Sequence, residues 1–135
     1  MVRMSATYMG EKHCEIKHEP SGSMIETDAP RDNQGRGERF SPTDLVGAAL
    51  GSCILTTMAI MAEKNGISFV GASAGFSKEM NAQPRQIQRL PVEVRMPKGL
   101  SPEDRKRLEA AARACPVHRS LNAEIEAPIT FVYVD

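Results

Sequence analysis

One long apolar stretch, residues 41–66 (SPTDLVGAALGSCILTTMAIMAEKNG), decides the fold of this chain. Ser41 is a good N-cap, Pro42 suits the first helical position, and Asp44 stands three residues after the cap, as in a capping box. Asn65 and Gly66 supply a left-handed stop. The stretch therefore predicts a helix of about six turns.

The centre of this helix, residues 45–62, carries no charge, so it must be shielded from water on nearly every side. Its length reaches the lower limit of a membrane span. However, Gly, Ala, Ser and Thr make up about half of it, and nothing else in the chain suits lipid. We therefore expect the core of a small domain or of a dimer, with small residues that let a neighbouring backbone approach: Gly47, Ala48, Ala49, Gly51 and Ser52.

Short strand-like segments flank the helix on both sides, which predicts an α+β fold. The first three segments have few apolar residues and need another surface to pack against. Pro91 marks a bulge or an edge in the second group. In chain order we expect strands at 2–8, 12–18 and 23–27, a loop at 28–40, the long helix, strands at 67–80 and 85–96, helices from Ser101 and at 116–121, and a last strand at 128–134.

Composition narrows the class of protein. The 135 residues are 41% hydrophobic and 25% charged, which indicates a single globular domain over residues 1–135. Seventeen basic residues balance seventeen acidic ones, so no net field favours nucleic acid or a membrane surface. Residues 1–10 lack the apolar run of a signal peptide, and three cysteines do not suit a secreted disulfide scaffold. We expect a cytoplasmic protein without a cofactor, nucleic acid or membrane partner.

Two cysteines stand in different settings. Cys53 lies in the middle of the long helix, whereas Cys115 directly precedes Pro116 at the start of a short helix. Backbone N–H groups and the helix dipole at that start favour a thiolate at Cys115. Cys53 would then need a neighbouring cation for activation. A single buried cysteine is usually inert packing, but the two settings together indicate redox chemistry.

Other candidate ligands are weaker. His13, Cys14 and His18 resemble metal ligands in print, yet on a strand His13 faces away from Cys14, and Cys14 to His18 spans roughly 13 Å. We expect no metal there, and we expect Cys14 to be a half-buried strand residue. His118 could face Cys115 within one helical turn, but a solvated surface histidine is the commoner outcome.

Two sequence blocks together resemble the family of osmotically inducible protein C (OsmC) and the organic hydroperoxide resistance proteins (Ohr). They are FSPTDLVGAALGSC at 40–53 and ACPVHRSL at 114–121, and the order of the expected elements is also similar. The resemblance implies an intertwined α+β homodimer with antiparallel sheets around a long central apolar helix. It also implies that the two long helices pack back to back and that each site forms at the subunit interface.

The resemblance implies a chemistry as well. In the peroxidase members, the cysteine of the central helix attacks the O–O bond of a hydroperoxide and becomes a sulfenic acid, which the second cysteine resolves as a disulfide. Carried over, Cys53 is the peroxidatic residue and Cys115 is the resolving residue. The implied substrate is an organic hydroperoxide, and the thiol reductant stays unidentified.

One position departs from the peroxidase pattern. Those members place a glutamate ten residues before the first cysteine, where it pairs with an arginine that stabilises the thiolate; here that position is Thr43, which cannot form an ion pair. Arg31, Arg36 and Arg39 are unranked candidates for the arginine. The chain therefore resembles the OsmC-like branch. Two functions stay open: a thiol-dependent peroxidase in oxidative stress defence, or a non-catalytic dimer that binds a small apolar or thiol-reactive ligand at its interface.

Overall fold

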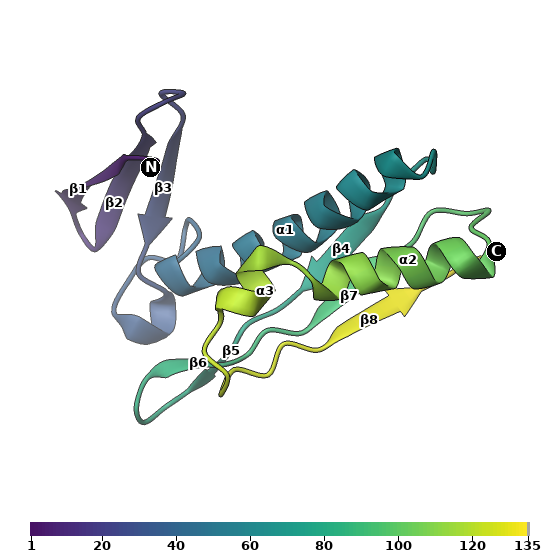
Figure 1. Ribbon diagram of the computed structural model, residues 1–135. Coiled ribbons are helices and arrows are strands. Elements are labelled where there is room, and N and C mark those ends of the chain that lie inside the picture. The colour runs from purple at the N-terminus through teal and green to yellow at the C-terminus, as the bar shows by residue number, and fades with distance from the viewer. Residues whose placement is uncertain (135) are drawn as a thin grey trace. The chain divides into compact units, whose positions relative to one another are not determined.

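The computed structural model describes residues 1–134 and has the α+β architecture that the sequence predicts (Figure 1). The chain divides into two compact units, Met1–Val46 and Gly47–Asp135, each of which has its own internal contacts. The long helix α1 (Pro42–Lys64) begins in the first unit and continues through the second. Its organisation as a single domain stays a prediction of the sequence.

The first unit is a small antiparallel sheet. Its strands β1 (Met4–Gly10), β2 (His13–His18) and β3 (Met24–Asp28) pair in the order β1-β2-β3, which confirms the three strands expected there. The β1–β2 turn needs left-handed backbone, and Gly10 supplies it at φ 92°. A short 3₁₀ turn, η1 (Arg31–Asn33), lies within the loop that follows β3.

The first unit has no apolar core. Among residues 1–134, every buried apolar residue lies in the second unit, and the buried residues of the first are polar: Thr27, Asp28 and Ser41. A short sheet needs an apolar face packed on something to be stable in water. The sparse apolar residues of these strands already indicated that the sheet needs another surface to pack against. The large apolar side chains of the unit that are exposed are Met1, Val2, Met4, Tyr8, Met9, Met24, Ile25 and Phe40.

The start and end of α1 are those that the sequence predicts. The backbone N–H of Asp44 donates to Ser41 Oγ (3.0 Å), and the backbone N–H of Ser41 donates to Asp44 Oδ2 (2.9 Å), so two N–H groups are satisfied reciprocally. At the other end Gly66 takes φ 65°, and the Ile67 N–H donates to the Ala62 carbonyl (2.9 Å). This is the expected left-handed stop.

The second unit contains a mixed sheet and a hairpin. Strands β4 (Ser73–Phe76), β7 (Val92–Arg95) and β8 (Ile129–Val132) pair in the order β4-β7-β8, with β4 antiparallel and β8 parallel to β7. Strands β5 (Glu79–Asn81) and β6 (Gln86–Arg89) form the hairpin.

The strands expected at 67–80 and 85–96 are each broken in two, so these two predictions were wrong. Residues 67–72 lie outside any strand and include a turn at 70–71, with Gly71 at φ 97°. The break between β6 and β7 falls at Leu90 and Pro91, since proline has no N–H to continue a ladder. The break between β4 and β5 falls at Ser77 and Lys78.

The core lies between the helices and one face of the mixed sheet (Figure 1). Leu50, Ile54, Met58 and Ala62 form one buried line of α1, spaced four residues apart. Helix α2 (Pro102–Arg113), capped by Ser101, contributes Leu108, Ala111 and Ala112. On β7 the alternation predicted from the sequence is confirmed: Val92 and Val94 are buried, while Glu93 and Arg95 are exposed.

Within one chain, α1 is not shielded all round. Ala49, Ser52, Thr56, Ile60 and Glu63 are exposed at intervals of three or four residues, and they form a stripe opposite the buried line. Ile60 is 52% exposed. By length and hydropathy α1 also passes the test for a membrane span, a test that the core helix of a soluble protein passes as well. The exposed stripe carries only one charge, at its far end.

Candidate functional site

The structure brings Cys53 and Cys115 together. Cys53 lies near the middle of α1, and Cys115 is the N-cap of the short helix α3 (Pro116–Ser120). Both are free thiols, Cys53 half-buried and Cys115 fully buried, and their side chains are hydrogen-bond partners. Two sulfurs 62 positions apart in sequence thus meet because α3 starts against the middle of α1.

The Cys53 sulfur lies in an environment that favours a thiolate. Burial raises the pKa of Cys53, but hydrogen bonds from the Cys115 thiol, the Val117 backbone N–H and the Thr57 hydroxyl outweigh that effect and hold the pKa below its ordinary value. The Thr57 hydroxyl oxygen is 3.8 Å from the Cys53 sulfur. All three donors stabilise the charged form, so Cys53 is the better nucleophile of the pair.

The Cys115 sulfur has the opposite tendency. Burial raises the pKa of Cys115, and donation of its hydrogen to Cys53 raises it further, while the backbone N–H groups of His118 and Val117 act in the other direction without compensating. Cys115 therefore keeps its proton when Cys53 has lost one. One site therefore holds a thiol with a lowered pKa beside a thiol with a raised pKa.

This arrangement corrects the expected assignment of the helix N-terminus. The sequence led us to expect that the start of α3 would activate Cys115 and that Cys53 would need a cation. Instead, the Val117 N–H of α3 is among the groups that lower the pKa of Cys53, and Cys115 has a raised pKa. The first turn of α3 does lower the pKa of Cys115, as expected, but burial and the hydrogen bond to Cys53 outweigh it, and the same turn also serves Cys53.

Sequence reasoning also missed the role of His118. It is half-buried, not solvated, and its Nε2 lies 3.0 Å from the carbonyl oxygen of Ala127. Its backbone N–H, like that of Val117, lowers the pKa of Cys115. The only signal in the sequence was its position three residues after Cys115, which suggested a contact with the thiol and not with a distant carbonyl.

Thr43 and the three arginines belong to the first unit and have partners there. Thr43 Oγ1 lies 3.2 Å from Ser41 Oγ, next to the capping pair of α1. Arg31 Nε donates to the Arg36 carbonyl (3.1 Å), Arg36 pairs with Glu11, and Arg39 Nε lies 3.3 Å from Glu26 Oε2: each arginine has a polar partner. The groups that shift the pKa of Cys53 do not include any of these arginines.

A polar cluster around His13 was not foreseen. His13 Nδ1 lies 2.6 Å from Asp28 Oδ1 and Nε2 lies 3.1 Å from Glu26 Oε1, so one imidazole joins two carboxylates of β3. Asp28 is buried and also accepts from the Glu38 backbone N–H (3.1 Å). The cluster ties β2, β3 and the following loop together, which gives His13 a structural role.

The structure gives no support to metal binding by His13, Cys14 and His18. Among residues 1–134, no group of three or more His, Cys, Asp or Glu side chains could hold a metal ion. Cys14 is half-buried on β2 between Tyr8 of β1 and Thr27 of β3, as expected.

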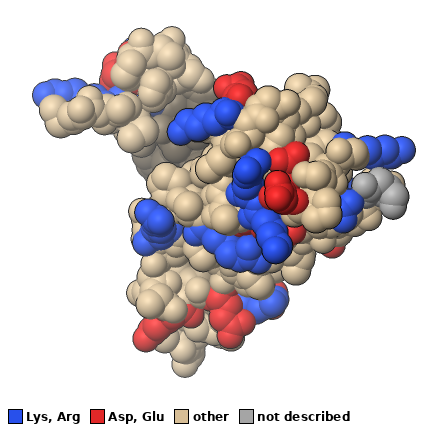
Figure 2. All heavy atoms as spheres, turned by 45° about the vertical axis from the view of Figure 1, so that its right-hand side comes forward, with Lys and Arg blue, Asp and Glu red and all other residues tan. Residues whose placement is uncertain are grey.

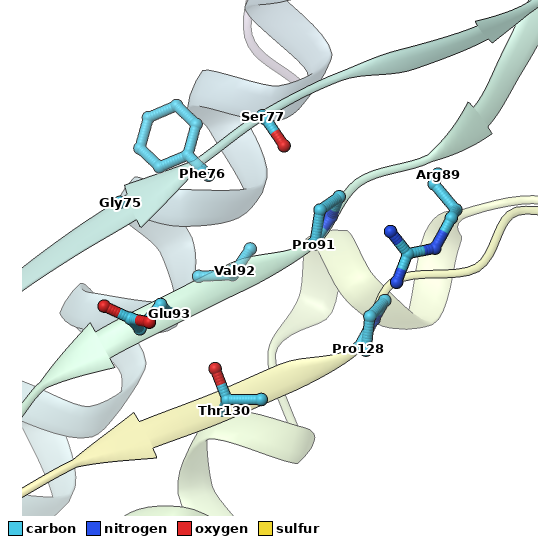
Figure 3. A pocket seen from close by; sticks show the side chains of 9 residues that line it. All are labelled: Gly75, Phe76, Ser77, Arg89, Pro91, Val92, Glu93, Pro128 and Thr130. Carbon is cyan, nitrogen blue, oxygen red and sulfur yellow. The ribbon is translucent and has the colours of Figure 1, made fainter.

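A hollow of about 510 Å³ lies on the mixed sheet (Figure 3). Arg89, which lines it, forms salt bridges with Glu79 (2.7 Å) and Glu126 (3.1 Å). The cysteines do not line it. In Figure 2, basic side chains gather near the middle of the visible face beside acidic ones, as the zero net charge suggests. The residues that line the hollow are Gly75, Phe76, Ser77, Arg89, Pro91, Val92, Glu93, Pro128 and Thr130.

Comparison with known sequence families identifies one match. The family described as OsmC-like protein matches residues 35–130, which include both cysteines. A search of curated protein sequences found no match to the chain.

Several solved structures share the fold. A Psychrobacter arcticus protein, named for osmotic stress and detoxification responses, is 35% identical over 98% of this chain and 96% of its own, with a TM-score of 0.93. An organic hydroperoxide resistance protein OsmC from Legionella pneumophila is 17% identical over 97% and 96%, with a TM-score of 0.78. OhrB from Bacillus subtilis, also an organic hydroperoxide resistance protein, is 16% identical over 98% of both chains, with a TM-score of 0.67.

Proposed function

Because this chain belongs to the OsmC-like family, we propose that it is a thiol-dependent peroxidase that reduces organic hydroperoxides, with Cys53 as the nucleophile and Cys115 as the resolving thiol. The observation that carries the proposal is the asymmetric pair of sulfurs: the pKa of Cys53 is lowered and that of Cys115 is raised within one hydrogen-bonded site. Names of relatives that refer to organic hydroperoxide resistance support the same substrate class.

The first chemical step uses the Cys53 thiolate. Its sulfur attacks the terminal oxygen of R–O–O–H, an S–O bond forms, and the O–O bond breaks. The alkoxide takes up a proton and leaves as the alcohol ROH, so the peroxide is reduced and Cys53 is oxidised to a sulfenic acid. The donors from Val117 and Thr57, which favour the thiolate, support Cys53 as the attacking residue.

The second step uses Cys115. Its sulfur attacks the sulfur of the Cys53 sulfenic acid, a disulfide forms, and the hydroxide leaves with the Cys115 proton as water. A dithiol, or two equivalents of a monothiol, then reduces the disulfide. The opposite pKa shifts fit this order, because Cys53 loses its proton before Cys115 does and is therefore the first of the two to attack.

We propose further that the chain acts as an intertwined cytoplasmic homodimer. Two exposed apolar surfaces support it: the stripe on α1 that includes Ala49 and Ile60, and the sheet of the first unit, which has no apolar core. A second copy of the chain offers matching apolar area for both. In this arrangement residues 1–135 act as one domain.

A non-catalytic dimer that binds a small apolar or thiol-reactive ligand is the second candidate. Thr43 favours it, because a hydroxyl cannot form the ion pair that a glutamate would make with an arginine near the thiolate. The two candidates differ in turnover and not in fold.

The test is an assay of purified, reduced protein with dithiothreitol as the reductant. We expect consumption of cumene hydroperoxide over many turnovers, at least tenfold faster than that of hydrogen peroxide. Residual peroxide is measured with a ferrous xylenol orange dye. If neither cumene hydroperoxide nor hydrogen peroxide is consumed, the peroxidase function is refuted and the ligand-binding dimer remains.

A further inference from the structure

The two chemical steps give no role to the imidazole of His118 on α3. Its Nε2 lies 3.0 Å from the carbonyl oxygen of Ala127, nine residues further along the chain. A carbonyl oxygen can only accept, so Nε2 must carry the hydrogen. The ring therefore ties the third residue of α3 to the segment that leads into β8.

The acceptor at Ala127 is held firmly. On one side of it the Leu90 N–H donates to the Glu126 carbonyl (2.8 Å), and on the other the Val92 N–H donates to the Pro128 carbonyl (3.0 Å). Carbonyl directions alternate along an extended chain, so the Ala127 carbonyl points away from β7. Since β8 is the edge strand of the order β4-β7-β8, that direction is the open edge of the sheet.

The other end of this connection is the pair of sulfurs. Helix α3 has five residues, too few to hold its own geometry in water. Yet its first turn must be placed accurately, because the Val117 N–H serves both Cys53 and Cys115, and the His118 N–H serves Cys115 as well. His118 thus carries both one of these N–H groups and the ring that fixes the helix to the sheet edge.

We propose that His118 is a positioning residue, whose ring anchor on the Ala127 carbonyl keeps the first turn of α3, with the Val117 N–H, aimed at the Cys53 sulfur. His118 acts through the backbone of α3 and does not contact the reacting oxygen. The inference deepens the proposed function and rests on it in one respect, namely that the Cys53 thiolate is the reacting group.

The test compares His118→Leu with His118→Gln in the full-length reduced protein. Leucine fills the space without a donor, whereas the glutamine amide nitrogen reaches about the place of Nε2 and restores the donor. The readout is the pH dependence of Cys53 alkylation by iodoacetamide, resolved peptide by peptide by mass spectrometry so that Cys14 and Cys115 do not contribute. We expect His118→Leu to shift the profile to higher pH, with roughly three- to tenfold slower alkylation at neutral pH, and His118→Gln to recover most of it.

Two results would overturn the proposal: a His118→Leu profile that overlays the wild type, or equal shifts in both variants, which would assign the effect to ring size and not to the donor. A measurement on the unmodified protein covers the case in which His118→Leu does not fold. In ¹⁵N NMR of the His118 ring, a slowly exchanging hydrogen on Nε2 supports the anchor, and hydrogen on Nδ1 alone overturns it.

The alkylation readout separates this inference from the peroxidase itself. Wild-type protein without hydroperoxide turnover would refute the proposed function, while the shift in alkylation between the two variants would still test His118. Conversely, a His118→Leu protein with a wild-type alkylation profile would refute the anchor even if hydroperoxide turnover were normal.

Discussion

At the residue scale, the different roles that we propose for the two thiols follow from the hydrogen bonds of each sulfur. Cys53 accepts hydrogen bonds from three groups and has a lowered pKa, whereas Cys115 is fully buried, donates to Cys53 and has a raised pKa. A thiolate reacts with peroxide far faster than a thiol. The sequence alone assigned the start of α3 to Cys115 only, because it cannot show that Cys53 also lies in front of that turn or that burial outweighs its effect on Cys115.

The first prediction separates the roles of the cysteines. Cys53→Ser abolishes hydroperoxide consumption, because the attacking sulfur is gone. Cys115→Ser consumes about two equivalents of hydroperoxide per subunit and then stops: the first forms the Cys53 sulfenic acid, which has no partner, and the second oxidises it to sulfinic acid. Intact-mass spectrometry after peroxide addition measures this as a gain of two oxygens on Cys53. Cys14→Ser serves as the control and turns over as the wild type does; loss of turnover there would contradict the assignment.

The second prediction concerns Thr43. Thr43→Glu places a carboxylate in the first turn of α1, where the helix dipole tolerates it, and offers a partner to an arginine of the preceding loop. We expect faster hydroperoxide turnover, by roughly tenfold if the ion pair favours the thiolate by about one pKa unit. Thr43→Gln is the matched control, with the same shape and no charge. Equal rates in both variants would show that charge at this position does not limit the reaction.

At the element scale, the sequence predicted those elements whose ends are set by local chemistry. The cap at Ser41 and the stop at Gly66 were predicted correctly because each acts within a few residues. The strand expected at 67–80 failed because its pairing partners lie elsewhere in the chain, and Gly71 allows a turn that ends the extended run. The contact between α1 and α3 was beyond sequence reasoning for the same reason, and only the family resemblance paired the two cysteines.

The third prediction uses the small residues of α1. Gly51 faces the Phe76 ring, and a Cβ at Gly51 would overlap the ring carbons, so an aromatic side chain and not a backbone makes the close approach. Gly51→Leu should lower the free energy of unfolding, since overpacking costs roughly 1–3 kcal/mol and exceeds the gain of about 0.8 kcal/mol in helix propensity. Urea unfolding measures the loss. Ala110→Leu, on the exposed face of α2, is the control and should change it by no more than about 0.5 kcal/mol.

The fourth prediction concerns the cluster around His13 in the first unit. The hydrogen bond to Asp28 raises the pKa of His13 above 6.5, against the effect of burial. The stabilisation from charged His13 is therefore complete below about pH 6.5 and is lost as the pH rises through the raised value. For Asp28, the bond from His13 lowers the pKa below 3.8, and for Glu26 the bond from Arg39 lowers it below 4.5. Their contribution is present above those values and is lost as the pH falls through the lowered ones.

Thermal unfolding followed by circular dichroism between pH 3 and pH 9 measures this window. The wild type should be most stable between roughly pH 4.5 and 6.5 with respect to this cluster. His13→Ala should lower the melting temperature most within that window and least at its alkaline side. His18→Ala, on the same strand, is the control. If both variants lose stability equally at every pH, the cluster does not make this contribution.

At the scale of the whole molecule, a single chain exposes apolar surface in two places. The first unit has no apolar core, and α1 exposes a stripe that includes Ala49, Thr56 and Ile60. Exposed apolar surface of this extent marks an interface in soluble proteins. A membrane span at α1 would leave the exposed sheet of the first unit unexplained, whereas the homodimer that we propose would cover both surfaces.

The last prediction tests that dimer with one substitution at two places. Ala49 and Ala110 are both exposed helical alanines, Ala49 on the stripe of α1 and Ala110 on α2. Ala49→Glu would bury a charge between the two long helices, at a cost of several kcal/mol, so the dimer should dissociate or unfold at micromolar concentration. Ala110→Glu should remain dimeric. Analytical ultracentrifugation measures the mass in each case. A stable, folded wild-type monomer at micromolar concentration would contradict the dimer, because it would show that the exposed stripe of α1 does not have to be buried against a second chain.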